Sequence, residues 1–393
     1  MEKIIFHIDV NNAFLSWTAV DMLRKGSTID IRTIPSIIGG DESKRHGIVL
    51  AKSTPAKKMG IKTADTIYNT RKICRNIKVF PADYDLYEKE SNKLFNLLTK
   101  YTPIIERYSI DECFLDMSGT KFLYNNLEEL AYKIKDEVEK NLGFTVNIGI
   151  GNNKLCAKMA SDFEKPNKVH TLYKEEIETK MWPLLVGELF MIGKASTIKL
   201  NEIGIYTVKD LATCDINKLK KHFKNQSTFM WEYANGIDNS VVNFESDKNK
   251  CISISTTLLK DTDDLEELRK VLFRLADSIG RSLRKQQMYA SVIGLTVRTS
   301  DFVDSSIQTS LLNGINKTDD IYNNIIKLFT KKYVGVLIRN IGIRLSDLSN
   351  ILNKQEGLFD TVKYEDKKMD KLVDDLKEKF GDDKVTIAAL KDK

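Results

Sequence analysis

The sequence predicts an α+β multidomain protein, and three observations lead to this fold class. With 393 residues, the chain is too long for a single hydrophobic core, so we expect two to four domains. Strand-like and helix-like segments alternate through the first 166 residues, a pattern typical of α/β or α+β structure. After Pro166 short helical segments dominate until about residue 235, and strands return from residue 251.

The N-terminal part is predicted to surround one acidic centre. Residues 3–10 form an apolar run that ends in an acid, which suits a buried strand, and residues 13–24 predict a helix that Asn11 or Asn12 could cap. Residues 107–119 contain two β-rich runs around an acidic pair, which predicts a hairpin. The remaining predicted elements are helices over 86–100, 127–141 and 153–167, and a strand over 144–151.

The C-terminal half is predicted to hold a helical module and a second β-rich domain. Residues 184–235 read as short helices punctuated by glycine, and the polar stretch 241–250 reads as a linker. Between residues 251 and 346, three strands enclose two helical stretches, and the chain beyond residue 350 is charged and tail-like. The three strand-like runs are CISISTTL, SVIGLTVRTSDF and VLIRNIGIRLSDL.

Composition limits the classes of function and of metal site. No run approaches the ~18 apolar residues that a membrane helix needs, and the N-terminus is not a signal peptide, so we expect a cytoplasmic protein without membrane contact. The net charge of +6 permits a polyanionic partner. The five cysteines form no CxxC pair and the four histidines lack ligand spacing. Any metal would therefore be held by carboxylates, which favours magnesium or manganese.

The candidate chemistry centres on Asp9, Asp111 and Glu112, each at the end of an apolar β run or between two such runs. An isolated buried carboxylate is costly, so these charges need water, partners or a metal. Asp111 and Glu112 can converge only if the hairpin turns there, because neighbours on a strand point to opposite faces. Alone, Asp9 could cap the next helix, and the acidic pair could be an ordinary turn. Together the three favour a two-metal phosphoryl-transfer site.

Four segments in order identify a family. IIFHIDVNNAF, YSIDECFLDMSG, NIGIGNNKLCAKMASDFEKPN and the helical module after them resemble the Y-family DNA polymerases, which include the bacterial DinB and UmuC types and the UvrX-like branch. The resemblance covers about residues 1–350. It implies a low-fidelity, DNA-template-directed DNA polymerase that copies past damaged bases without proofreading. Its partners would be primer–template DNA and deoxynucleoside triphosphates, and its cofactors two Mg²⁺ ions, which Mn²⁺ could replace.

The resemblance also implies roles for single residues around the reacting groups. Asp9, Asp111, Glu112 and the carbonyl of Val10 would bind the metals, and Phe14 falls at the steric-gate position beneath the sugar. Without the family pattern, Phe14 would be read as a core aromatic. The nucleotide's phosphates would contact Thr54, Lys57 and Lys165. The family usually has tyrosine at the position of Thr54 and arginine at the position of Lys57. Lysine keeps the charge of arginine but loses its bidentate fork.

DNA and clamp contacts are implied for the C-terminal half. Residues 189–211 resemble the thumb's helix–hairpin–helix, in which Gly193 would approach a DNA phosphate; Met191 replaces a usual glycine, and a purely structural helical hairpin is the alternative. Candidates for phosphate contacts in the little finger are Arg298, Arg339 and Arg344. The sequence QEGLF resembles a sliding-clamp-binding peptide through Gln355, Leu358 and Phe359, although a tail folding back on its own domain would also explain it.

The resemblance implies a right-hand polymerase with small fingers, a helical thumb and an α+β little finger, and we expect a monomer. The alternatives are a catalytically silent, clamp-associated DNA-binding protein and a nucleotide cyclase on a similar palm. The intact acidic triad opposes the first, and Phe14, the thumb and the little finger oppose the second. The predicted domains are the palm (1–20 and 80–166), fingers (21–79), thumb (167–240), linker (241–250), little finger (251–350) and tail (351–393).

Overall fold

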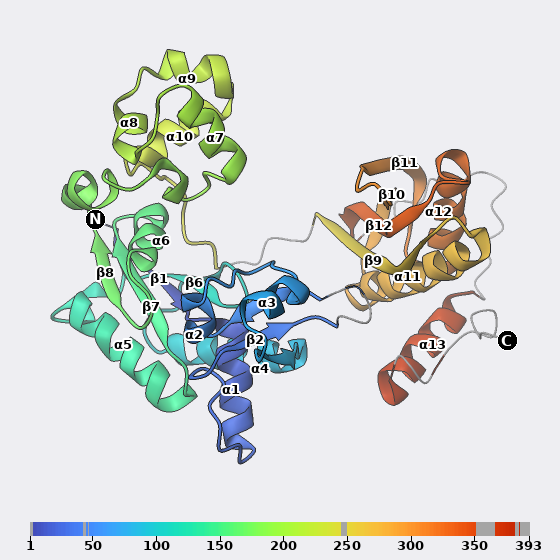
Figure 1. Cartoon of the computed structure of the whole chain (residues 1–393), viewed down its shortest axis with the longest axis horizontal. Coiled ribbons are helices and arrows are strands. Elements are labelled where there is room, and N and C mark those ends of the chain that lie inside the picture. The colour runs from blue at the N-terminus through green and yellow to red at the C-terminus, as the bar shows by residue number, and fades with distance from the viewer. Residues whose placement is uncertain are drawn as a thin grey trace. The chain divides into compact units, whose positions relative to one another are not determined.

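The computed structural model describes residues 3–41, 45, 47–244, 250–350, 366–381 and 385 (Figure 1). Its internal contacts divide the chain into two units. The first comprises Met1–Gly40 and Gly47–Ser246, and the second Asp41–His46 and Asp247–Lys393. Among the described residues, no helix has the length and apolar character to cross a membrane. The finer division into palm, fingers, thumb and little finger stays a prediction.

A five-stranded sheet with β1 (Ile5–Val10) at its centre forms the middle of the first unit. All six residues of β1 are buried, as expected for a near-continuous apolar run with a strand on either side. β1 pairs antiparallel with β6 and β7, and the register places Asp9 opposite Glu112. The strand order is β5 (Ile105–Arg107), β6 (Glu112–Asp116), β1, β7 (Val146–Gly151) and β8 (Val169–Leu172).

Helices pack on both faces of this sheet. Ile4, Phe6 and Ile8 belong to the largest core of the unit, where they join Trp17 and Tyr87. The residues of β1 between them face the opposite side, as the pleat requires. That side is covered by α6, which contacts β1, β7 and β8. The helices are α1 (Ala13–Arg24), α4 (Tyr84–Leu98), α5 (Leu127–Leu142) and α6 (Lys154–Asp162).

Two glycines let α6 lie directly on β7. A Cβ at Gly149 would stand 2.0 Å from the Ala157 carbonyl oxygen, and one at Gly151 would stand 2.6 Å from the Ala157 nitrogen. Both obstacles are backbone atoms, which cannot move aside without shifting the helix. The glycines of NIGIGNN therefore set the distance between strand and helix.

The predicted elements of this unit are present, but their ends differ, and the helix expected over 153–167 covers only Lys154–Asp162. The helix expected over 13–24 has these bounds, but Asn12, at its N-cap with φ 49°, makes no side-chain capping bond. The helix expected over 86–100 starts at Tyr84, because Asp83 accepts a hydrogen bond from the Leu86 amide and caps it. The hairpin is formed by β5 and β6, and residues 108–111 make its turn.

Two smaller substructures complete the first unit. The first is a three-stranded sheet, and its elements are β2 (Ser36–Gly39), β3 (Val49–Lys52), β4 (Lys78–Pro81), α2 (Thr54–Lys58) and α3 (Ile67–Ile73). The second is the helical module expected after Pro166, whose core shares Leu155 and Met159 with α6. Its helices are α7 (Lys194–Glu202), α8 (Val208–Thr213), α9 (Ile216–Phe223) and α10 (Gln226–Ala234).

The second unit is a four-stranded antiparallel sheet with two helices and its own hydrophobic core. The strand order is β11 (Asp304–Ile315), β10 (Tyr289–Thr299), β12 (Ile338–Ser349) and β9 (Cys251–Thr262), and the helices are α11 (Leu265–Lys285) and α12 (Thr318–Lys332). The sequence predicted only three strands here, which is wrong. The fourth, β11, is a polar edge strand with no buried residue, so it lacks the apolar alternation that reveals a half-buried strand.

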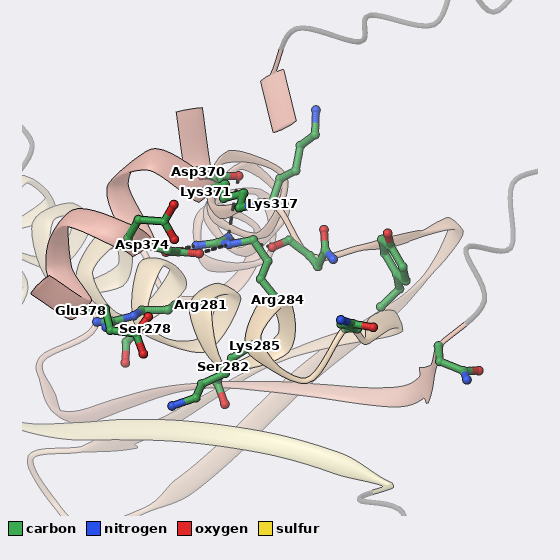
Figure 2. Close-up of a pocket in the computed structure, with 15 residues that line it drawn as sticks. Ser278, Arg281, Ser282, Arg284, Lys285, Lys317, Asp370, Lys371, Asp374 and Glu378 are labelled. Carbon is green, nitrogen blue, oxygen red and sulfur yellow. Dashed lines mark hydrogen bonds and ion pairs between the residues drawn. The ribbon is translucent and has the colours of Figure 1, made fainter. Parts of the chain in front are cut away.

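A final helix, α13 (Asp366–Phe380), lies against α11 (Figure 2). The Arg284 guanidinium donates to both carboxylate oxygens of Asp374, at 2.7 and 2.9 Å. Asp370 lies 3.7 Å from the same arginine, and Lys377 pairs with Asp277 on α11. The core of the second unit includes no residue of α13. Ion pairs therefore hold the described part of this helix in place.

Removing the Arg284 fork should release α13 while the sheet stays folded. A charge-assisted bond of this kind contributes about 1.5–3 kcal/mol, so Arg284→Met should speed amide exchange in α13 by roughly tenfold or more. Hydrogen–deuterium exchange read by mass spectrometry measures this. Arg298→Met is the matched control, because Arg298 makes a similar fork to Asp304 on an exposed surface. Unchanged exchange in α13 of Arg284→Met would contradict the assignment.

Candidate active site

Backbone pairing brings the three predicted carboxylates to one end of the central sheet. Asp9 and Glu112 are cross-strand partners in β1 and β6, so their side chains share a face. Asp111 precedes β6 in the turn, and its carbonyl accepts a hydrogen bond from the Val10 amide at 3.0 Å. The hairpin therefore turns at Asp111, as is needed for Asp111 and Glu112 to approach one another. Because Asp111 lies in the turn, its side chain does not have to point to the face opposite Glu112.

Asp9 is a buried acid paired with a lysine. Its side chain is 9% exposed, and it forms an ion pair with Lys165, which also lies 2.8 Å from Asp162. Burial raises the pKa of the Asp9 carboxyl to about 6, against the opposing effect of Lys165. Burial acts to lower the pKa of Lys165, but Asp9 and Asp162 raise it above its usual value. Asp9 thus contacts a cation and does not cap α1.

Glu112 is held by two residues that sequence reasoning missed. Lys158 of α6 donates to one carboxylate oxygen at 2.5 Å, and His7 Nε2 lies 3.9 Å from the other. His7 is fully buried, its Nδ1 lies 2.8 Å from Ser161 Oγ, and its Nε2 has no hydrogen-bond partner. Burial, and then the nearby lysines, lower the pKa of His7 well below its usual value, so this imidazole is neutral. Lys158 lies within the segment NIGIGNNKLCAKMASDFEKPN, but only the fold shows that it forms a hydrogen bond with Glu112.

Asp111 is half-buried, as is Glu112, whereas Asp9 is buried. Ser109 Oγ donates to its Oδ1 at 2.6 Å, which fixes the carboxylate within the turn. Asp111 and Asp9 both line a cavity of about 320 Å³, whereas Glu112 does not line it. Glu112 lies instead toward Lys158 and His7.

The cavity brings together most of the residues predicted around the nucleotide. It is lined from the central sheet, from α1 and from the segment β3–α2. The predicted residues in its wall are Asp9, Val10, Asp111, Phe14, Thr54, Lys57 and Lys165. Further wall residues that the sequence did not single out are Asn11, Asn12, Ala13, Leu50, Ala51, Lys52, Thr63 and Pro166. One pocket therefore holds both acids and lysines, and Lys165 is paired with Asp9 in its wall.

Phe14 forms part of the cavity wall and is held by other aromatic rings. Its ring stacks on Tyr87 with 4.4 Å between centroids and 6° between planes. Tyr84 meets it edge-on at 6.0 Å. Tyr87 is fully buried and its hydroxyl lies 3.2 Å from Thr18 Oγ1, so the platform under Phe14 is fixed. A ring placed this way presents a rigid apolar surface to whatever enters the cavity.

The donor set fits a hard divalent cation. Carboxylates of Asp9, Asp111 and Glu112, and a carbonyl from Val10, are the oxygen ligands that Mg²⁺ and Mn²⁺ prefer. No group of three His, Cys, Asp or Glu side chains among the described residues is arranged to hold a metal ion. In the structure Asp9 and Glu112 form ion pairs with Lys165 and Lys158, respectively. The two ammonium groups supply positive charge that buried carboxylates need, and a divalent cation meets the same demand.

The residues predicted to belong to a thumb lie at the start of α7. Gly193 is the N-cap of this helix, with open space where a Cβ would project. Met191, where the family usually has glycine, adopts φ 71° and is exposed. This left-handed backbone explains why glycine suits the position, and it makes Met191 a strained residue on the surface.

The three predicted arginines lie on the sheet of the second unit. Arg298 on β10 pairs with Asp304, and Arg339 on β12 lies 3.6 Å from Asp261 and 4.5 Å from the Phe302 ring centroid. Arg344 is exposed, and one of its guanidinium nitrogens lies 3.8 Å from Cys251 Sγ. Arg298 and Arg344 share a face with Ser255, Thr296 and Ser306, according to the register. The predicted clamp-binding residues Gln355, Leu358 and Phe359 lie outside the described residues.

Comparisons with known proteins identify the family. Residues 8–162 match the impB/mucB/samB family, and residues 249–358 match its C-terminal domain. The chain is 48% identical to DNA polymerase IV of Clostridium acetobutylicum, over 100% of this chain and 99% of that protein. It is 33% identical to DNA polymerase IV 2 of Bacillus subtilis, over 99% of this chain and 94% of that protein.

Solved structures agree with this assignment. The chain matches DinB from Sulfolobus solfataricus at 26% identity with a TM-score of 0.58, over 87% of this chain and 98% of that chain. It matches an insertion ternary complex of Dbh DNA polymerase at 25% identity with a TM-score of 0.62 and the same coverage. The chain therefore belongs to the impB/mucB/samB family, whose members are the Y-family DNA polymerases.

Proposed function

We propose that the cavity between Asp9, Phe14 and Lys57 is the nucleotidyl-transfer centre of this translesion DNA polymerase. A primer 3′-hydroxyl would attack the α-phosphorus of a deoxynucleoside triphosphate, forming a phosphodiester and releasing pyrophosphate and a proton. The observation that carries the proposal is that one cavity gathers two of the three predicted carboxylates, the predicted gate ring and the predicted phosphate-binding lysines. The cavity therefore holds oxygen ligands for cations together with cationic side chains for phosphates.

The acids and lysines have complementary tasks in this scheme. Asp9, Asp111, Glu112 and the Val10 carbonyl would hold two Mg²⁺ ions, with Mn²⁺ as a substitute, and the bound cations would supply charge for the reacting oxygens. When the nucleotide enters, Lys165 can exchange its contact with Asp9 for a phosphate oxygen, since its ammonium already lies beside the cavity. Lys158 is buried and does not line the cavity, so it would remain beside Glu112. The lysines thus act as counterions before substrate arrives, and rate comes from positioning and electrostatics.

The other parts of the chain would handle the DNA. Gly193 would present the N-terminus of α7 to a phosphate, and Arg298, Arg339 and Arg344 would contact the backbone without reading sequence. The exposed face shared by Arg298 and Arg344 carries small polar side chains, which suits close approach to a phosphate backbone. We further propose a cytoplasmic monomer that binds a sliding clamp through Gln355, Leu358 and Phe359. Family membership and the intact acids count against the silent DNA-binding alternative.

Primer extension tests the catalytic assignment. Purified protein with magnesium should extend a primer on an intact template and past an abasic position. The double variant Asp111→Ala/Glu112→Ala should lose at least about a thousandfold in rate, because electrostatic stabilisation of the transition state is lost. Lys168→Ala serves as a surface control, since Lys168 is half exposed and its ion pair with Glu164, within the described part of the chain, is a loose 3.7 Å contact. Near-normal extension by the double variant would overturn the assignment.

Removal of the Phe14 ring tests sugar selection. Phe14→Ala should admit ribonucleotides more readily by roughly a hundredfold or more, because the clash with the 2′-hydroxyl disappears. The ratio kcat/KM for dCTP over that for CTP opposite template guanine measures the change. Phe95→Ala removes a buried ring of the same core that does not line the cavity, so it controls for destabilisation. Equal ratios in the wild type and Phe14→Ala would remove Phe14 from this role.

The clamp assignment separates binding from chemistry. Replacing Leu358 and Phe359 with alanine should weaken clamp binding at least about a hundredfold, as expected for two apolar anchors. Basal primer extension without clamp should stay within about twofold of the wild type. Surface plasmon resonance on immobilised clamp measures the first property. Persistent clamp binding by the double variant would show that another surface makes the contact.

A further inference from the structure

Lys52 is a cation in the nucleotide cavity that neither the family motifs nor the acidic triad accounts for. It is the last residue of β3 and lines the cavity together with Lys57 and Lys165. Its ammonium group donates to Thr63 Oγ1 at 2.9 Å, and Thr63 lines the same cavity. Lys52 therefore forms part of the cavity wall, and Thr63, another residue of that wall, holds its ammonium group in place.

The lysines of the cavity differ in their partners. Lys165 is ion-paired with Asp9 and Asp162. Neither Lys52 nor Lys57 has a carboxylate within ion-pair distance among the described residues. Burial, followed by the like charge of Lys57, lowers the pKa of Lys52 below its usual value. Two ammonium groups that repel one another, beside a cavity of about 320 Å³, mark a place for a multiply charged anion.

The backbone around Lys52 is held in place before any ligand arrives. Ile37 on β2 pairs with Lys52, and the next residue, Ser53, is fully buried. Ser53 Oγ accepts from the amides of Ser36 and Ala56, and it donates to the Ile34 carbonyl at 2.7 Å. The Ser53 side chain thus ties β2, the strand paired with β3, to the start of α2, the helix that carries Lys57. The positions of Lys52 and Lys57 are linked through this serine.

We propose that Lys52, positioned by Thr63, is a further residue that binds the triphosphate together with Lys57. The second lysine compensates for the bidentate contact that an arginine at position 57 would make and that a single lysine cannot make. Two lysines offer two separate charges where one guanidinium offers two parallel donors. The inference rests on the proposed function, since it places the nucleotide's phosphates in this cavity. It adds a residue to that site, and the residue acts on nucleotide affinity and not on the chemical step.

Steady-state incorporation of dCTP opposite guanine tests the proposal. Lys52→Met should raise the KM for dCTP about tenfold, with kcat and the Kd for primer–template DNA within about twofold. Lys58→Met is the matched control, because Lys58 is exposed on α2 and does not line the cavity. Inhibition by magnesium tripolyphosphate should weaken in parallel with the rise in KM. A raised Kd for DNA with unchanged KM would instead place Lys52 on the template strand and overturn the proposal.

A second series of variants tests whether Lys52 compensates for the bidentate contact that an arginine at position 57 would make. In a Lys57→Arg background the fork is restored, so Lys52→Met should raise KM by less than about threefold. An equal tenfold cost in both backgrounds would refute the compensating role. The series also separates the two claims. If Asp111→Ala/Glu112→Ala abolishes extension while Lys52→Met leaves KM unchanged, only the inference about Lys52 fails; if the double variant stays active, the proposed centre itself fails.

Discussion

The antiparallel pairing of β1 with β6 is the constraint on which the site depends. It joins residues more than 100 positions apart in the sequence and places Asp9 directly opposite Glu112. A slip of one residue would exchange the two faces of β1 and turn His7 and Asp9 toward the large apolar core that now holds Phe6 and Ile8. The register of a hydrophobic strand therefore fixes where two charges meet. The Asp111 carbonyl accepts a hydrogen bond from the Val10 amide, which extends the pairing by one residue and brings the third acid to the same end of the sheet.

Charge balance is the second requirement of this arrangement. A buried carboxylate at the end of a sheet is unfavourable unless a cation lies nearby, and here lysines on or just beyond α6 provide that cation. Both lysines reach the site because α6 packs against β1, β7 and β8. The helix thus has two roles, since it covers one face of the sheet and neutralises its acids. Substrate and metal binding would replace existing ion pairs, which keeps the net change in charge small.

Most of the fold and the centre of the site could be predicted because their signals are local. An apolar run ending in Asp9, and an acidic pair between two β runs, both lie within short stretches of sequence. The strand β11 was missed because an exposed edge strand carries no apolar period. Lys158, His7 and Lys52 were missed for another reason. Their roles come from contacts across 46, 105 and 11 positions of sequence, which no local pattern encodes.

The close contact of α6 with β7 has a consequence for how this chain can vary. At Gly149, a methyl group would stand 2.0 Å from a backbone oxygen of the helix, so even alanine would push α6 outward. Lys158 would move with the helix and lose its reach to Glu112. A change from glycine to alanine, usually counted among the mildest, would here act like deletion of a charged group. Gly149 therefore affects the position of a residue beside Glu112, although it does not itself line the cavity.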